Sequence, residues 1–183
     1  MSTRLQRRMG ATKQLQNRGL LKNGGRVIDT VKYIVVDVSG ASGIFPIMDS
    51  NTKKSVGVTN FDGNKFNPGR HAVIDSIKIE KATAGTTRET ASFIGDTTLP
   101  KELSNCEFRV EQKGLVPVDL PVNEMNQPTA NQKSTAYREL STLPVLVADE
   151  EIGMFIQFPV GVTAPASTII RVSFACHQIK IEN

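Results

Sequence analysis

From residue 27 onward, the chain is a series of short segments in which apolar residues occupy every second position. In residues 105–112, Cys106, Phe108 and Val110 fall on one face, and charged residues fall on the other. A period of two is the pattern of a half-buried antiparallel strand, because successive side chains point to opposite faces of a sheet. This pattern predicts a fold built from antiparallel sheets.

Similar runs of β-branched and alternating apolar residues between turn residues predict further strands. They cover residues 27–38, 44–48, 72–81, 115–120, 143–148, 152–159 and 167–181. Pro117 indicates an edge strand, and Lys113-Gly114 is predicted to form a hairpin turn before it. Residues 121–136 are polar and are predicted to form a long surface loop, a kind of segment that is often functional. The only helix expected from residue 27 onward is a short turn near residues 99–103.

The fold class is therefore all-β: an antiparallel β-sandwich of about eight strands, preceded by a basic, flexible N-terminal arm. A chain of 183 residues fits one domain. We assign residues 1–26 to the arm and residues 27–183 to a single β-sandwich domain.

The arm is defined by its charge. Its first 26 residues contain no acidic residue, whereas the rest of the chain has 15 of the 22 basic residues and all 18 acidic ones. The arm has few large apolar side chains to offset the entropy of ordering, so we expect it to be flexible when free. The candidate contact residues for nucleic acid or a neighbouring subunit are its seven cations: Arg4, Arg7, Arg8, Lys13, Arg18, Lys22 and Arg26.

Three interpretations of this arm are open. It is a solvated terminus, a phosphate-binding arm whose cations release counterions from nucleic acid, or a helix lying on a membrane surface. Leu5 and Met9 have the spacing of neighbours on one helix face, but Gly10 interrupts that face and no aromatic residue anchors it. We favour the phosphate-binding arm.

The residues for catalysis are sparse, and we expect no enzyme. His71 and His177 are the only histidines. Cys176 and His177 are neighbours on a predicted strand and therefore point to opposite faces, which predicts a core cysteine beside a surface histidine. The acidic run at residues 149–151 is expected to be solvated. We expect no cofactor and no metal site.

No segment approaches the length of uncharged apolar sequence that spans a membrane, so no membrane span is expected. With only Cys106 and Cys176, the chain has no disulfide framework, which favours a reducing, intracellular origin. The low aromatic content of 5% and the lack of tryptophan disfavour an aromatic pocket.

A basic, glycine-punctuated arm followed by one antiparallel sandwich resembles the single jelly-roll coat proteins of small icosahedral viruses, including tailless bacteriophages. The resemblance covers the organisation of the whole chain and includes no diagnostic motif. It implies a virion structural protein, a capsid or vertex subunit, that self-assembles into an icosahedral shell. It also implies an arm that faces the genome or neighbouring subunits, homo-oligomeric and other virion partners, non-specific nucleic-acid contact, and synthesis in the host cytoplasm.

Other classes stay open beside this one. The main alternative is a β-sandwich binding module, tethered to a larger particle, that recognises a receptor or carbohydrate through residues 121–136 and 161–166. A nucleic-acid-binding regulator is a third possibility, although such a protein would carry unbalanced cations on its folded surface as well as in its arm. The oligomeric state of the purified chain, at low and high salt, discriminates the shell protein from the tethered module.

Overall fold

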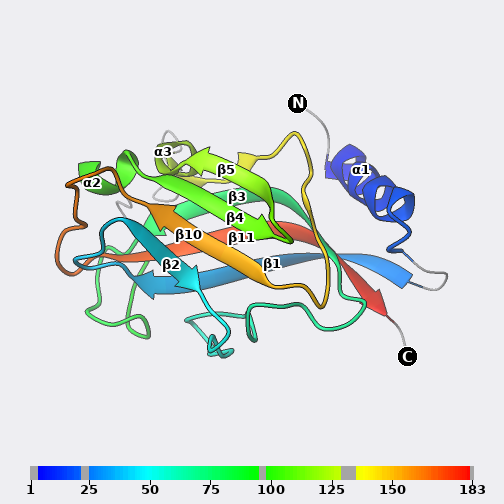
Figure 1. The fold of residues 1–183 in the computed structure, drawn as a ribbon, viewed down its shortest axis with the longest axis horizontal. Coiled ribbons are helices and arrows are strands. Elements are labelled where there is room, and N and C mark those ends of the chain that lie inside the picture. Colours follow the sequence, from blue (N-terminus) through cyan, green and yellow to red (C-terminus); the bar gives the residue numbers. More distant parts are fainter. Residues whose placement is uncertain (1–3, 22–24, 95–97, 129–134, 182–183) are drawn as a thin grey trace.

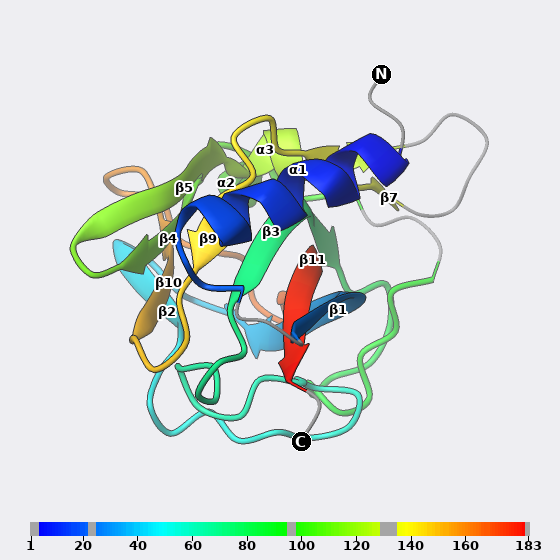
Figure 2. The same cartoon turned by 90° about the vertical axis from the view of Figure 1, so that its right-hand side faces the viewer.

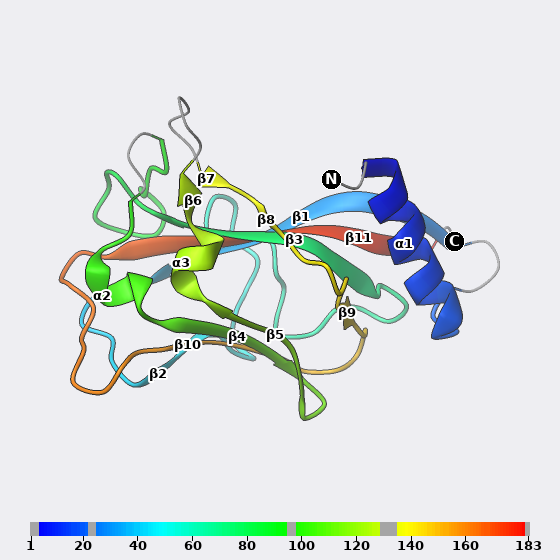
Figure 3. The ribbon, with the colours of Figure 1, turned by 90° about the horizontal axis from the view of Figure 1, so that it is seen from above.

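The computed structural model describes residues 4–21, 25–94, 98–128 and 135–181. Its longer strands form two antiparallel sheets that pack face to face (Figures 1 and 3). Seen from above in Figure 3, the sheet that contains β1, β3 and β11 forms one layer, and the sheet that contains β2, β4, β5 and β10 forms the other. This arrangement confirms the predicted antiparallel β-sandwich.

The larger sheet has β11 at its centre. Its strand order is β1 (Gly25–Asp37), β11 (Ile169–Ile181), β3 (Ala72–Lys81) and β8 (Arg138–Glu139), and β9 (Val145–Leu146) also pairs with β3. β1 and β11 are paired along their whole length, from Gly25 opposite Ile181 to Asp37 opposite Ile169. The two longest strands of the described structure therefore run side by side through this sheet.

The smaller sheet has four strands. Their order is β2 (Ile44–Met48), β10 (Ile152–Gln157), β4 (Glu107–Gln112) and β5 (Leu115–Pro121). β5 lies at the edge, as Pro117 predicted. Lys113 and Gly114 form the β4–β5 turn with φ values of 54° and 70°, the left-handed conformation of a tight two-residue hairpin. A separate pair consists of β6 (Gln127–Pro128) and β7 (Thr135–Ala136).

The pairs of strands are nested along the chain. β1 pairs with β11, β2 with β10, β3 with β8 and β9, and β4 with β5, each pair lying inside the previous one in sequence. Successive pairs alternate between the two sheets. The chain therefore passes from one sheet to the other at nearly every connection.

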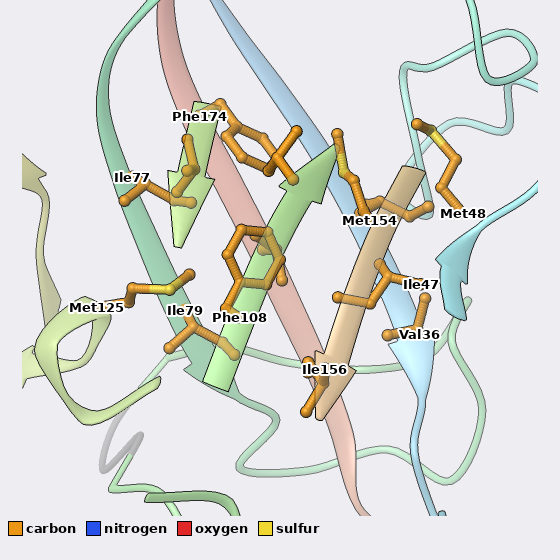
Figure 4. Packing of buried hydrophobic residues seen from close by; sticks show 14 of the residues in the cluster. Val36, Ile47, Met48, Ile77, Ile79, Phe108, Met125, Met154, Ile156 and Phe174 are labelled. Carbon is orange, nitrogen blue, oxygen red and sulfur yellow. The ribbon is translucent and has the colours of Figure 1, made fainter. Parts of the chain in front are cut away.

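The main core lies between the sheets, and the alternating residues of both sheets fill it. Cys106, Phe108 and Val110 are buried there, as their spacing predicted. Figure 4 shows Phe108 of β4 and Phe174 of β11 facing each other across the layers, with their ring centroids 6.2 Å apart. This packing couples the two sheets.

The arm differs from the prediction of a flexible segment. Residues Arg4–Asn17 form helix α1, which lies across the end of the large sheet, beside β3, β9 and β11 (Figure 2). Ala11 and Leu15 are fully buried in a second cluster with residues of the sheet. The burial of Leu15 alone favours docking by about 1.5–3 kcal/mol, which offsets part of the entropy of ordering that the sequence argument set against folding.

Two glycines shape helix α1. Gly10 does not break the helix: it faces Leu143, and a Cβ at Gly10 would come within 3.1 Å of Leu143 Cδ1. Gly19, with φ of 65°, ends the helix; its own amide donates to Gln16 O, and the amide of Leu20 donates to Leu15 O. Both bonds define a Schellman motif, in which glycine adopts the left-handed conformation cheaply.

The other segments follow the predicted elements with some differences. The strand expected at residues 143–148 is reduced to β9, and the turn near residues 99–103 becomes helix α2 (Lys101–Ser104). The predicted loop at residues 121–136 begins with helix α3 (Val122–Met125), whose Val122 and Met125 are part of the main core. Residues 129–134 of that loop lie outside the described structure. In the ranges described, no helix combines the length and apolarity required to cross a membrane.

Candidate functional site

The outer face of the large sheet is divided into two covered ends and an uncovered middle. On β1, Ile34 and Val36 face the main core, whereas Val27 and Val35 point to the other side. Helix α1 covers the end at Val27, and loops that carry Val58 cover the end at Val35. Charged side chains occupy the middle of this face, so they lie between two apolar clusters.

Arg7 connects helix α1 to this charged region. Its Nε lies 2.5 Å from Asp75 Oδ1 on β3, and its Nη1 lies 3.3 Å from Glu139 Oε2 on β8. Its Nη2 donates hydrogen bonds to the carbonyl oxygens of Asp75 and Leu140. The side chain is only 12% exposed. Charge-assisted hydrogen bonds of this kind are stronger than neutral ones, so Arg7 fixes the helix on the sheet.

His177, on β11, lies directly opposite Asp29 of β1. Its Nδ1 is 2.8 Å from Asp29 Oδ1. Because an ionised carboxylate only accepts hydrogen bonds, Nδ1 is the donor. Nε2 is buried, has no hydrogen-bond partner among the described residues, and lies 3.8 Å from Asp75 Oδ1, the oxygen that Arg7 also contacts. The predicted surface histidine is therefore a buried one, with its side chain 7% exposed.

A second charged cluster lies further along the same face. Glu80 of β3 is 1% exposed, and one of its carboxylate oxygens accepts hydrogen bonds from Nε and Nη2 of Arg171 at 3.0 and 2.7 Å. Its other oxygen accepts a bond from Lys78 Nζ at 3.0 Å. Burial, with a smaller contribution from the charge of Glu80, raises the pKa of Tyr137, whose ring lies under Lys78 Nζ. The buried carboxylate of Glu80 thus has partners for both of its oxygens.

A groove of about 680 Å³ opens on this face beside α1. Five of its lining residues are arginine, histidine or carboxylate side chains, and they come from five different elements: Arg7, Asp29, Asp75, Glu139 and His177. Three of them are carboxylates, so the groove without Arg7 would be an acidic surface. The arrangement is suited to holding a cation, and in the described structure Arg7 is the cation that it holds.

The seven predicted contact residues do not act as one group. Arg7 is used within the chain, and Arg8 is exposed but donates a hydrogen bond to Val27 O. Lys13, Arg18 and Arg26 are exposed, and Arg4 begins α1. Lys22 lies outside the described residues. The prediction for Arg7 therefore needs correction: its guanidinium is occupied by Asp75 and Glu139 while the helix is docked.

The other sequence candidates largely match their predictions. The acidic run is solvated, as expected: Asp149 and Glu151 are exposed, and the ion pairs of Glu150 with Lys113 at 2.8 Å and of Glu151 with Lys65 at 3.4 Å lie at the surface. Cys176 lies in the main core while His177 lies on the outer face, as their adjacency predicted. Within the described residues, no group of three or more histidine, cysteine or acidic side chains is arranged to hold a metal ion.

The sequence analysis missed the groove, although part of its signal was present. Asp29, Asp75 and His177 are among the polar residues on the strand faces opposite those that fill the main core. Alternation identifies such residues as outward-facing, but it cannot tell which strands are neighbours. The pairing of β1 with β11 and of β11 with β3 is what brings the three side chains together.

Comparison with known proteins gives no family for the chain. No family model matches it, and neither a curated protein nor a solved structure is detectably similar to it.

Proposed function

We propose that the chain is a virion structural protein, a capsid or vertex subunit that assembles with copies of itself into an icosahedral shell. The nested order of strand pairs carries this proposal. Jelly rolls are two-sheet folds of eight strands that contain two Greek keys, and viral capsid domains are among them. The pairs β1–β11, β2–β10, β3–β8 and β4–β5, which alternate between the sheets, support a jelly roll here.

The exposed edges of the smaller sheet supply surface for contact between copies. Ile44 on β2 is 67% exposed and Leu115 on β5 is 69% exposed, and Val116 beside it is also exposed. Apolar side chains at sheet edges favour association with another chain. A closed shell repeats one set of contacts many times, so each contact can be weak.

The proposed role of the arm rests on its charge. Arg8, Lys13, Arg18 and Arg26 present exposed cations in the docked state, and no acidic residue precedes Asp29. Such cations bind phosphates without regard to base sequence. The arm then holds the genome or an acidic surface of a neighbouring subunit. The protein acts by packing in the virion, after synthesis in the host cytoplasm, and not as an enzyme.

Light scattering coupled to size-exclusion chromatography of the full chain, at low and high salt, tests the assembly. We expect pentamers, hexamers or larger particles, with closed shells visible by negative-stain electron microscopy. Loss of these species at high salt would assign the contacts to charged groups. A monomer at every salt and protein concentration would overturn the proposal and favour the tethered binding module.

The role of the arm has its own test, the salt dependence of binding to a single-stranded polynucleotide. The variant Arg8→Gln/Lys13→Gln/Arg18→Gln removes three cations of the arm, and Lys53→Gln/Lys54→Gln/Lys101→Gln removes three exposed cations of the body. We expect the arm variant to reduce the slope of log K against log salt by about 2, since each phosphate contact contributes about 0.7. Equal slopes for the two variants would show that the arm has no special part in binding.

A further inference from the structure

The side chains of Arg7 and His177 both approach one carboxylate oxygen in the groove beside α1. Asp75 Oδ1 lies 2.5 Å from Arg7 Nε and 3.8 Å from His177 Nε2. Arg7 belongs to the helix, whereas His177 and Asp75 belong to the sheet. The ion pair between Arg7 and Asp75, which holds the helix on the sheet, therefore uses the same oxygen, Asp75 Oδ1, that a proton on His177 Nε2 would approach.

The protonation state of His177 changes what that atom contacts. With the imidazole neutral, the proton is on Nδ1, toward Asp29, and Nε2 presents a lone pair. With the imidazole charged, Nε2 becomes a donor aimed at Asp75, and a second positive charge appears beside the guanidinium of Arg7. Histidine is the side chain whose charge ordinarily changes between about pH 5 and pH 8.

We propose that protonation of His177 releases helix α1 from the sheet at acidic pH. The imidazolium would give Asp75 a positively charged partner within the sheet, and it would repel the guanidinium of Arg7. The imidazolium would then bridge Asp29 and Asp75. The apolar contacts of Ala11 and Leu15 would then be the main interactions that still keep the helix on the sheet. The docked helix is favoured at neutral pH, and the released helix becomes more populated as the pH falls.

The surroundings of His177 are consistent with this direction. The charged groups that face it come from each neighbouring element: Asp29 of β1, Asp75 of β3, Arg7 of α1 and Glu139 of β8. Tyr137 lines the same groove as a neutral phenol. When Arg7 leaves, His177 is the remaining basic side chain among the residues that line the groove. Repulsion between the imidazolium and Arg7 in the docked state, and attraction of the imidazolium to Asp75 after Arg7 has left, both link protonation to release.

This inference rests on the proposed function in one respect, because release would free Arg7 to join the other cations of the arm. Docking of α1 on the sheet takes place within one chain and does not depend on assembly. It is measurable on dilute protein whether or not the chain assembles or binds nucleic acid, so failure of the release and failure of the shell proposal are distinguishable.

Hydrogen exchange of the full chain, followed by mass spectrometry at pH 7.5 and 5.5, tests the release, with rates corrected for intrinsic exchange. Peptides from α1 report docking, and peptides from β3 report unfolding of the sheet. We expect α1 to lose about tenfold of its protection at the lower pH while β3 keeps its own, because local opening and global unfolding are separate events. His177→Gln, which keeps a donor toward Asp29 but takes up no proton, should abolish this loss.

Two further variants complete the experiment. His71→Gln removes the other histidine and should retain the full pH response, and Arg7→Gln should expose α1 at both pH values. The proposal is overturned if wild-type α1 shows no loss at pH 5.5, or if α1 and β3 respond equally. It is also overturned if His177→Gln keeps the response, because the carboxylates would then be the groups that sense acid.

Discussion

At the scale of single residues, the outer face of the large sheet shows how charge is buried without being left unpaired. Glu80 is covered almost completely, yet its two oxygens accept bonds from Arg171 and Lys78. Removal of one partner from a buried ion pair leaves the other charge unpaired and destabilises the fold by about 3–5 kcal/mol. Glu80 looks like an exposed strand residue in the sequence, because alternation gives the direction of a side chain and not what covers it.

The two cysteines give a prediction about alkaline pH. Burial raises the pKa of Cys106 to about 11 and that of Cys176 to about 12, from an ordinary value of 9.0. Above pH 9 the unfolded chain therefore loses thiol protons that the folded chain keeps. The resulting stability is present below pH 9 and is lost as the pH rises toward 11 or 12. We expect the free energy of unfolding to fall by on the order of 1 kcal/mol per thiol between about pH 9 and pH 10.

Urea unfolding at several alkaline pH values measures this fall, with Cys106→Ala/Cys176→Ala as the comparison. The variant should be less stable at every pH, because alanine leaves small cavities, but its stability should depend less on alkaline pH. The same pH dependence in both proteins would show that these thiols ionise in the folded chain.

At the scale of elements, strands were predictable where one face is apolar and the other is polar. The bounds of β2 and β3 agree with the predicted residues 44–48 and 72–81, and those of β4 and β5 agree to within two residues. The segment at residues 143–148 is apolar without alternation, and only Val145–Leu146 pairs with β3. A continuous apolar run does not specify which backbone groups are paired, so its length could not be predicted.

Helix α1 was not predictable as a docked element from its composition. Its buried face consists of two apolar side chains, Ala11 and Leu15, and of Arg7. Their partners, among them Val73 and Ile179, are far away in sequence. The end of the helix, in contrast, has a local signal, because glycine is common directly after the C-terminus of a helix. The charge of the arm does not reveal this role of Gly19.

Substitution of Gly19 tests the contribution of that helix end. Gly19→Ala places a Cβ in the left-handed conformation, at a cost of about 1–2 kcal/mol. Open space surrounds the new Cβ, so the effect is one of backbone conformation. We expect faster hydrogen exchange in α1 and a fall of about 1 kcal/mol in the free energy of docking.

Gly40→Ala is the matched control for this experiment. Gly40 has φ of 69° and equally open surroundings, but it lies in the turn after β1, away from α1. It should lower global stability without changing exchange in the helix. If both variants expose α1 to the same extent, the Schellman motif has no local role in docking.

At the scale of the whole molecule, the two sheets are held together by aromatic and aliphatic side chains that meet between them. Phe174 from the central strand of the large sheet contacts Phe108 of the small sheet and Phe61 of a connecting loop. It is 1% exposed. We expect Phe174→Ala to lower the free energy of unfolding by about 3–5 kcal/mol, because a cavity opens where the layers join.

Denaturant unfolding measures this loss, and Phe155→Ala provides the control. Phe155 lies half-buried on the outer face of the small sheet, with its ring over Gly153. Its removal should cost about 1 kcal/mol or less, in the range of surface substitutions. Similar losses in the two variants would contradict the central place of Phe174.

The candidate site also belongs to this scale, which explains why sequence reasoning did not locate it. Apart from Glu139, each of its charged residues lies on a predicted segment. Their assembly depends on strand order, since β11 lies between β1 and β3, and on a helix that folds back over their end. No local pattern encodes that order. The charge of the arm was legible in the sequence, whereas the use of Arg7 within the chain was not.

The position of β11 has a consequence for biosynthesis. It is the last strand of the described residues and yet the central partner of both β1 and β3. At ordinary rates of translation, synthesis of the residues between β1 and the end of β11 takes on the order of ten seconds, and β1 has no partner strand until then. During that interval its unpaired edge is open to strands of other nascent chains. The speed of the ribosome, and whatever shields β1 while it waits, therefore help to determine how much of the chain reaches its folded form.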